Sequence, residues 1–217
     1  MSNREKLPSS LYFQIFDTKR TKSELIKIKI LEAVIDCLAT QGLEATTFES
    51  IGKIVNMERA HVNYYFSSRK ELIKGAVRYA VATGQQIIIR NVKKANHWKD
   101  RLKIVIDGPF EWLSQYPKHF SVMSLFYYLC THDEDMRQLQ NVIQKGGEDR
   151  IAATLDVLVH NGQLTQTKIK EISRAVQSMI SGNIHYFFTS DYGWSMKQVR
   201  TKTVQMAVDL VTSQLSE

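Results

Sequence analysis

The segment that most constrains the fold is TTFESIGKIVNMERAHVNYYFSSRKEL, at residues 46–72. Thr46 and Thr47 are N-cap candidates, and Asn56 suits the left-handed conformation at which many helices end. Between them, spacings of three and four place four apolar side chains on one face of a short predicted helix: Phe48, Ile51, Ile54 and Val55. A second helical pattern at residues 59–66 lasts about two turns, which is too short to be stable alone in water.

Two short helices joined by so brief a turn are typical of a helix-turn-helix, whose second helix enters the major groove of DNA. The residues from Arg59 to Tyr65 supply polar and aromatic side chains suited to that position. The segment therefore predicts a small DNA-binding domain.

The string FESIGKIVNMERAHVNYYFSSRKEL resembles the DNA-binding signature of TetR-family transcriptional regulators. Ile51 and Gly52 stand where that signature has an Ile-Ala pair, and residues 56–58 occupy its turn. The aromatic segment and the start of the next helix match through Tyr64, Tyr65, Phe66, Ser67, Ser68, Arg69, Glu71 and Leu72. The close resemblance covers roughly residues 23–85.

Three residues depart from the family pattern. Gly52 replaces Ala inside a helix, at a cost of about 1 kcal/mol in helix propensity. Asn56 replaces Gly in the turn and still tolerates a positive φ. Arg69 replaces Lys, and both residues can hold a phosphate. None of the three changes removes a part that the motif requires.

The predicted fold is all-α, because turn signals separate helix-length stretches and no period-2 strand pattern is evident. We expect a flexible arm at residues 1–20 and the helix-turn-helix domain at 21–67, with its first helix capped by Ser23. A connecting helix at 68–84 begins with a Ser68 capping box. The resemblance implies that residues 85–217 form a helical effector-binding and dimerisation domain.

The basic residues are concentrated towards the N-terminus. Residues 1–95 hold 16 Lys and Arg against 9 Asp and Glu, a net charge of +7, whereas residues 96–217 are neutral. This asymmetry is typical of a phosphate-binding module joined to another kind of domain, although it also arises by chance.

The resemblance implies two groups of DNA contacts. Positions matched to phosphate contacts are Thr47, Tyr65, Arg69 and Lys70. Side chains on or beside the exposed face of the second helix would read bases: Arg59, Ala60, His61, Asn63 and Tyr64. The alternative for Tyr64 and Tyr65 is that they only pack the small domain.

An aromatic-rich stretch follows the connecting helix, and it predicts either a ligand cavity or an ordinary core. The family resemblance favours a cavity for a small effector. Its candidate lining residues are Trp98, Phe110, Trp112, Tyr116, Phe120, Met123, Phe126 and Tyr127.

Apolar stripes on the last two predicted helices indicate a homodimer built as a four-helix interface. The alternative is that these stripes face the core of their own chain. The candidate interface residues are Ile172, Val176, Met179, Ile180, Ile184, Phe187, Val199, Met206 and Leu210.

The sequence offers no support for an enzyme, because it lacks phosphate-cradling, zinc-protease and nucleophile-elbow motifs. Residues 132–135 read as a helix start rather than a cation site. We therefore expect no cofactor and no metal. Cys37 and Cys130 match no metal-binding spacing and read as buried thiols, with a disulfide or redox switch as the alternative. No apolar run is long enough to cross a bilayer, so the predicted location is cytoplasmic.

The predicted partners are double-stranded DNA with a palindromic operator, a small effector and a second copy of the chain. The predicted function is a repressor that a small apolar ligand releases from DNA. The alternative is a constitutive or architectural DNA-binding protein with the same DNA-binding domain and no effector.

Overall fold

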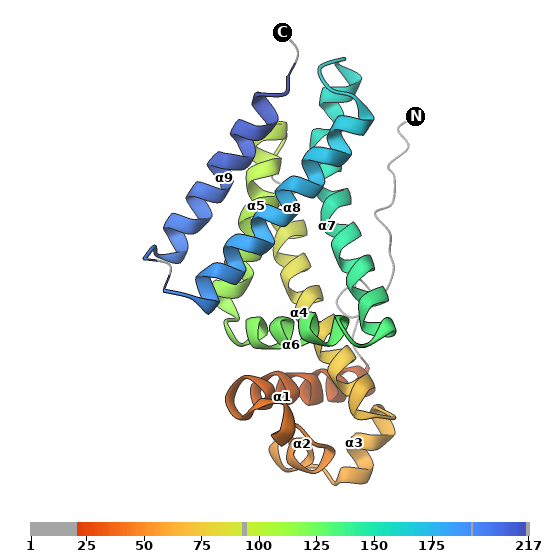
Figure 1. Cartoon of the computed structure of the whole chain (residues 1–217). Coiled ribbons are helices and arrows are strands. Elements are labelled where there is room, and N and C mark those ends of the chain that lie inside the picture. Colours follow the sequence, from red (N-terminus) through yellow and green to blue (C-terminus); the bar gives the residue numbers. More distant parts are fainter. Residues whose placement is uncertain (1–20, 93–94, 192, 216–217) are drawn as a thin grey trace. The chain divides into compact units, whose positions relative to one another are not determined.

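A computed structural model describes residues 21–92, 95–191 and 193–215, and within these ranges the secondary structure is entirely helical (Figure 1). The all-α prediction is confirmed. The predicted arm at residues 1–20 lies outside the described residues. The helices are α1 (Lys22–Ala45), α2 (Phe48–Val55), α3 (Arg59–Tyr65), α4 (Arg69–Val92), α5 (Trp98–Gln115), α6 (Lys118–Cys130), α7 (Glu134–His160), α8 (Gln166–Thr189) and α9 (Met196–Thr212).

The chain divides into two compact units. Unit 1 comprises the described residues up to Thr83 together with Lys118–Tyr128, and unit 2 comprises Gly84–Pro117 and the described residues from Leu129 onwards. Nearly all of α6 therefore groups with the helix-turn-helix segment, which the sequence did not predict. The other domain boundaries drawn from the sequence stay predictions.

The helix α1 begins two residues earlier than the sequence suggested. The Thr21 side chain accepts a hydrogen bond from the Glu24 amide at 3.2 Å, and the Glu24 carboxylate accepts one from the Thr21 amide at 2.7 Å. This reciprocal pair is a capping box, which satisfies two amides at the helix start. The predicted cap, Ser23, lies inside the helix, so that prediction was wrong.

The sequence predicted that the connecting helix ends near Gly84. The helix α4 instead continues to Val92. Ile87 and Ile88 are buried and extend its apolar face beyond the glycine. A Cβ at position 84 would lie 2.7 Å from the ring of Trp112 on α5. Gly84 therefore permits close packing of α5 against α4 and does not stop the helix.

Unit 1 buries side chains from each of its helices, including Val34, Ile51, Val62, Leu72 and Phe126. At the start of α6, the Lys118 ammonium contacts the Asp36 carboxylate on α1 at 2.9 Å. Both side chains of this pair are exposed, so the pair contributes little energy.

His119, next to Lys118, is 5% exposed, and burial lowers its pKa from 6.5 to about 4 against the opposing effect of Asp36. Between these two pH values the unfolded chain binds a proton that the folded chain does not, so the free energy of unfolding falls as the pH falls. We expect this residue to cost up to about 3 kcal/mol of stability over that range. In urea unfolding at a series of pH values, the free energy of unfolding of His119→Gln should fall less steeply with falling pH than that of the wild type. Identical pH dependence of the two proteins would contradict a lowered pKa for His119.

Unit 2 is a helical bundle with a continuous apolar core that includes Phe110, Leu155, Val176 and Ala207. Polar contacts fix α9 against its neighbours. The Arg200 guanidinium donates two hydrogen bonds of 2.7 Å to the Asp107 carboxylate on α5. The Asn183 amide on α8 donates to the Thr203 hydroxyl at 2.9 Å.

Candidate nucleic-acid interface

The start of α2 is fixed by Thr47. Its side chain accepts a hydrogen bond from the Ser50 amide at 3.1 Å, and the Ser50 hydroxyl accepts one from the Thr47 amide at 2.9 Å. Thr46 is buried and donates to the Gly42 carbonyl, so it belongs to the end of α1. Of the two predicted caps, Thr47 is the correct one.

The turn between α2 and α3 depends on Asn56, which has φ 56° and ψ 53° in the left-handed region. The next amide, of Met57, donates to the Gly52 carbonyl at 2.8 Å. A Cβ on Gly52 would lie 2.6 Å from the Met57 carbonyl oxygen. The glycine that departs from the family pattern is therefore required by the close return of the backbone.

The apolar face of α2 is narrower than the sequence suggested. Ile51 and Val55 are 0% and 2% exposed, whereas Ile54 is 49% exposed. Successive helical residues rotate by about 100°, which puts Ile54 on the far side of Ile51 from Val55. Ile54 therefore lies at the exposed edge of the predicted apolar face. The Lys29 ammonium on α1 donates to the Val55 carbonyl at 2.8 Å and so stabilises the end of α2.

The helix α3 is held by one buried side chain, Val62, which is 0% exposed. The predicted base-reading side chains all lie on its exposed surface: Arg59, Ala60, His61, Asn63 and Tyr64. Tyr64 is 81% exposed, so it does not pack the small domain, and one of the two alternatives for this residue is removed.

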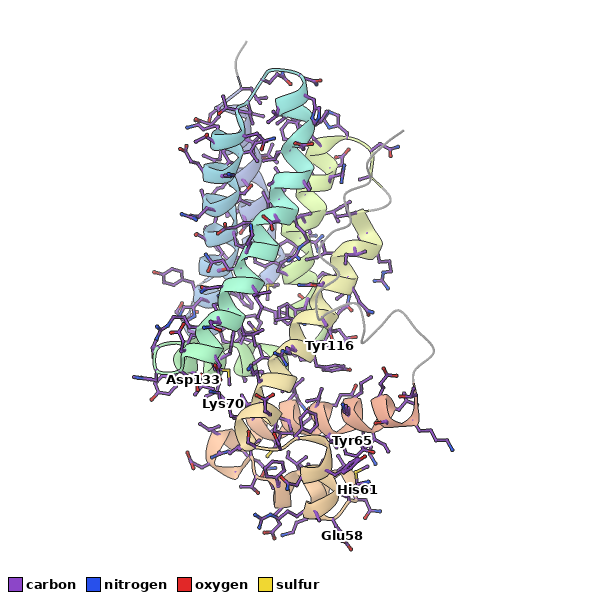
Figure 2. All side chains as sticks on the ribbon, turned by 90° about the vertical axis from the view of Figure 1, so that its right-hand side faces the viewer. Glu58, His61, Tyr65, Lys70, Tyr116 and Asp133 are labelled. Carbon is purple, nitrogen blue, oxygen red and sulfur yellow. The ribbon has the colours of Figure 1, made fainter. Side chains whose placement is uncertain are left out.

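Three aromatic rings line α3. His61 and Tyr65 stack with ring centroids 5.7 Å apart, and Tyr64 meets Tyr65 edge-on at 5.2 Å. Figure 2 shows His61 and Tyr65 along the same side of α3, with Glu58 near its beginning. Tyr65 is half-buried, so it supports the exposed rings on either side of it.

Arg69 is more constrained than the sequence indicated. Its Nε donates to the Thr46 carbonyl at 3.0 Å, and one terminal nitrogen donates to the Leu43 carbonyl. Both acceptors lie at the end of α1, where the last carbonyls lack the usual helical partner four residues on, although the Leu43 carbonyl also accepts a hydrogen bond from the Thr46 amide at 3.0 Å. Arg69 therefore ties the start of α4 to α1, and its contact with a phosphate stays a prediction, as does that of Lys70.

Replacing Arg69 by alanine is expected to lower both the stability of unit 1 and the affinity for every DNA sequence. Two hydrogen bonds from a charged donor are lost, at about 1.5–3 kcal/mol each. The slope of affinity against salt should also fall by about one if a phosphate contact is lost. Thermal unfolding and a salt series on random duplex separate the two effects. An unchanged salt slope would leave Arg69 with the structural role alone.

The sequence model of the family described as "Bacterial regulatory proteins, tetR family" matches residues 30–76, which include the end of α1, all of α2 and α3 and the start of α4. The biofilm operon icaADBC HTH-type negative transcriptional regulator IcaR of Staphylococcus aureus (strain Newman) is 31% identical over 77 residues. Residues 30–76 therefore form a DNA-binding domain of the TetR family of transcriptional regulators. The matched segment is 36% of this chain and 41% of IcaR, less than half of that relative.

Solved structures of TetR-like fold extend the likeness beyond the DNA-binding domain. A putative transcriptional regulator from Saccharomonospora viridis in complex with choline has a TM-score of 0.74 and 19% identity, and the match covers 89% of this chain and 98% of that one. A complex of SmeT with triclosan has a TM-score of 0.70 and 19% identity over 86% and 91% of the two chains. At this identity the likeness concerns the fold alone.

The eight predicted ligand-lining residues are divided between the two units. Trp98, Phe110, Trp112 and Tyr116 belong to unit 2, and the other four, on α6, belong to unit 1. Phe110 and Phe126 are 0% exposed, and Met123 is also buried. Tyr116 and Tyr127 are exposed, whereas Trp98, Trp112 and Phe120 are half-buried. That these eight residues line one effector cavity stays a prediction.

Part of the predicted dimer surface belongs to the chain's own core. Ile172, Val176, Ile180 and Val199 are each at most 3% exposed and lie in the core of unit 2. The burial of these four supports the alternative that the stripes face the core of their own chain, and the interface itself stays a prediction. Four others pack half-buried against that core: Met179, Ile184, Phe187 and Leu210. Met206 is 43% exposed.

Within the described ranges, no group of three or more His, Cys, Asp or Glu side chains is arranged to hold a metal ion. Among the same residues, no helix has both the length and the apolar character needed to cross a membrane.

Proposed function

We propose that this TetR-family protein is a sequence-specific repressor that binds a palindromic operator as a homodimer. The observation that carries the proposal is the division of α3 between one buried anchor, Val62, and a continuous exposed surface. A helix held from one side only is free to enter a major groove with the other side. The repressor role is supported by IcaR, which is named as a negative regulator.

The proposed interface separates contacts that hold DNA from contacts that read it. Thr47 lies at the N-terminus of α2, where backbone amides and the helix dipole favour a phosphate. Lys70 lies in the first turn of α4. Arg59, His61 and Asn63 on α3 would face base edges, because arginine pairs with guanine and asparagine with adenine.

The proposed dimer uses the outer surfaces of α8 and α9, which are not covered by their own chain. Tyr186 is 60% exposed and Met206 43% exposed. Half-buried neighbours such as Ile184 would complete the contact. Two DNA-binding domains related by a twofold axis would dock about 34–36 Å apart, which is the length of one turn of the DNA helix.

A small apolar effector is the proposed inducer, and choline and triclosan in the neighbouring structures support ligand binding by this fold. The helix α4 contributes residues to both units, so a ligand that favours one position of α4 would change DNA affinity. Coupling of this kind is typically about 1–3 kcal/mol. The buried Phe110 and Phe126 favour the alternative of a constitutive DNA-binding protein with filled cores.

A footprint on the DNA upstream of the chain's own gene, with and without cell extract, tests the proposal. We expect a protected palindrome that is lost when extract is added. Asn63→Ala is the matched variant, because it removes one exposed polar side chain from α3 and leaves Val62 in place. Protection that persists in extract would support the constitutive alternative, and equal protection by Asn63→Ala would contradict base reading by α3.

A further inference from the structure

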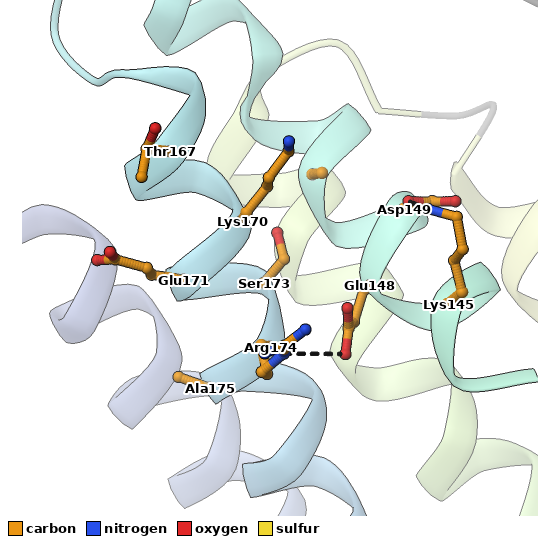
Figure 3. Close-up of a pocket in the computed structure, with 10 residues that line it drawn as sticks. Lys145, Glu148, Asp149, Thr167, Lys170, Glu171, Ser173, Arg174 and Ala175 are labelled. Carbon is orange, nitrogen blue, oxygen red and sulfur yellow. Dashed lines mark hydrogen bonds and ion pairs between the residues drawn. The ribbon is translucent and has the colours of Figure 1, made fainter. Parts of the chain in front are cut away.

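A groove of about 730 Å³ lies between α7 and α8 in unit 2 (Figure 3). From α8, Lys170, Ser173 and Arg174 occupy one face, because residues three and four apart are neighbours on a helix. From α7, Glu148 and Asp149 lie opposite them. None of the predicted effector-lining or DNA-contacting residues lines this groove.

Ser173 is the unusual member of the lining. It is 1% exposed, and its buried Oγ has no hydrogen-bond partner in the described structure. A serine within a helix ordinarily satisfies its hydroxyl at the carbonyl four residues earlier, and a buried hydroxyl without any partner is destabilising. In Figure 3 the side chain lies between Lys170 and Glu148, on the side of α8 that faces α7. The hydroxyl therefore lies at the wall of the groove with no hydrogen bond to the protein.

The groove is lined by three cations and three carboxylates, but one of these carboxylates pairs with a cation outside the lining. Lys145 contacts Asp149 at 3.2 Å, Arg174 contacts Glu148 at 3.7 Å, and Glu171 contacts Lys168, outside the lining, at 3.2 Å. Lys170 has no ion-pair partner among the described residues. A single negative charge in the groove would balance it. A doubly charged phosphate would instead meet repulsion from the three carboxylates.

We infer that this groove binds a small organic monocarboxylate, with the carboxylate held between the Lys170 ammonium and the Ser173 hydroxyl. Both groups donate hydrogen bonds, and a carboxylate only accepts them. The aliphatic stems of the lysines and the methyl group of Ala152 offer apolar contacts to the rest of the molecule. The inference does not depend on DNA binding or on an apolar effector.

Benzoate and its uncharged analogue benzamide are suitable probes, because they differ mainly in the carboxylate. With the full chain, about 10 mM benzoate should raise the melting temperature and benzamide should not. Lys170→Gln should weaken benzoate binding about tenfold or more, the effect of losing one charge-assisted hydrogen bond. Lys197→Gln, which removes the same charge from the exposed surface of α9 outside the groove, should bind as the wild type does.

Ser173→Ala provides a second test that does not alter charge. Without ligand it should be as stable as the wild type or more stable, because it removes an unsatisfied hydroxyl. Its affinity for benzoate should fall several-fold. Asn63→Ala should bind benzoate normally, which separates this site from DNA recognition. Absence of a benzoate response, an equal response to benzamide, or wild-type binding by Lys170→Gln would each overturn the inference.

Discussion

Replacing Arg59 by alanine should weaken binding to the preferred DNA sequence by about 1–3 kcal/mol and should relax the preference at one base position. Arg59 is the first residue of α3 and is exposed. Its planar guanidinium matches the two acceptors that guanine presents in the major groove. The measurement is selection of binding sites from random duplexes, followed by affinities for the selected and scrambled sequences.

Lys103→Ala is the control for the lost charge. Lys103 is an exposed cation on α5 that pairs with Asp100 at 3.4 Å, so its removal changes the net charge equally without touching α3. The Lys103→Ala protein should select the same DNA sequence as the wild type. If Arg59→Ala weakened binding to selected and scrambled duplexes by the same factor, Arg59 would be a phosphate contact and not a base reader.

Replacing Gly52 by alanine should destabilise unit 1 and abolish DNA binding, although alanine is the better helix former by about 1 kcal/mol. The added Cβ would lie 2.6 Å from the Met57 carbonyl oxygen, a contact that requires the backbone to move. Movement there displaces the hydrogen bond from the Met57 amide to Gly52 and the turn that sets α3 against α2. Overpacking of this kind typically costs about 1–3 kcal/mol.

Lys53→Ala is the matched control, because it introduces alanine at the next position of α2, on the exposed surface. The Lys53 side chain is 75% exposed and only pairs with Glu49. The unfolding free energy of the Lys53→Ala protein should stay within about 0.5 kcal/mol of the wild-type value. A Gly52→Ala protein at least as stable as the wild type in urea unfolding would show that the turn adjusts without cost.

The helix-turn-helix was the most predictable part of the structure, because its local signals agree with one another. Thr47 starts α2 and Asn56 ends it, as their side chains and conformational preferences indicated. The exposed surface of α3 also follows from its pattern, in which Val62 is the one buried residue. The path of the backbone in the turn could not be predicted from the sequence. This path leaves no room for a Cβ at position 52 and therefore requires glycine there.

Apolar periodicity was less informative in the second half of the chain. It correctly placed Ile172, Val176 and Ile180 on one face of α8, but it does not reveal whether a partner or the same chain covers that face. The structure shows that unit 2 covers it. The role of Arg69 was hidden for a similar reason, since its acceptors, Leu43 and Thr46, lie at the end of a helix distant in sequence.

The stoichiometry of the DNA complex tests the central proposal most directly. Sedimentation of the full chain, of 25.0 kDa, with a palindromic duplex and with a half-site duplex measures how many chains bind each. The proposal predicts two chains on the palindrome, with an affinity well above that for the half-site. A single chain on each duplex, bound with equal affinity, would contradict it.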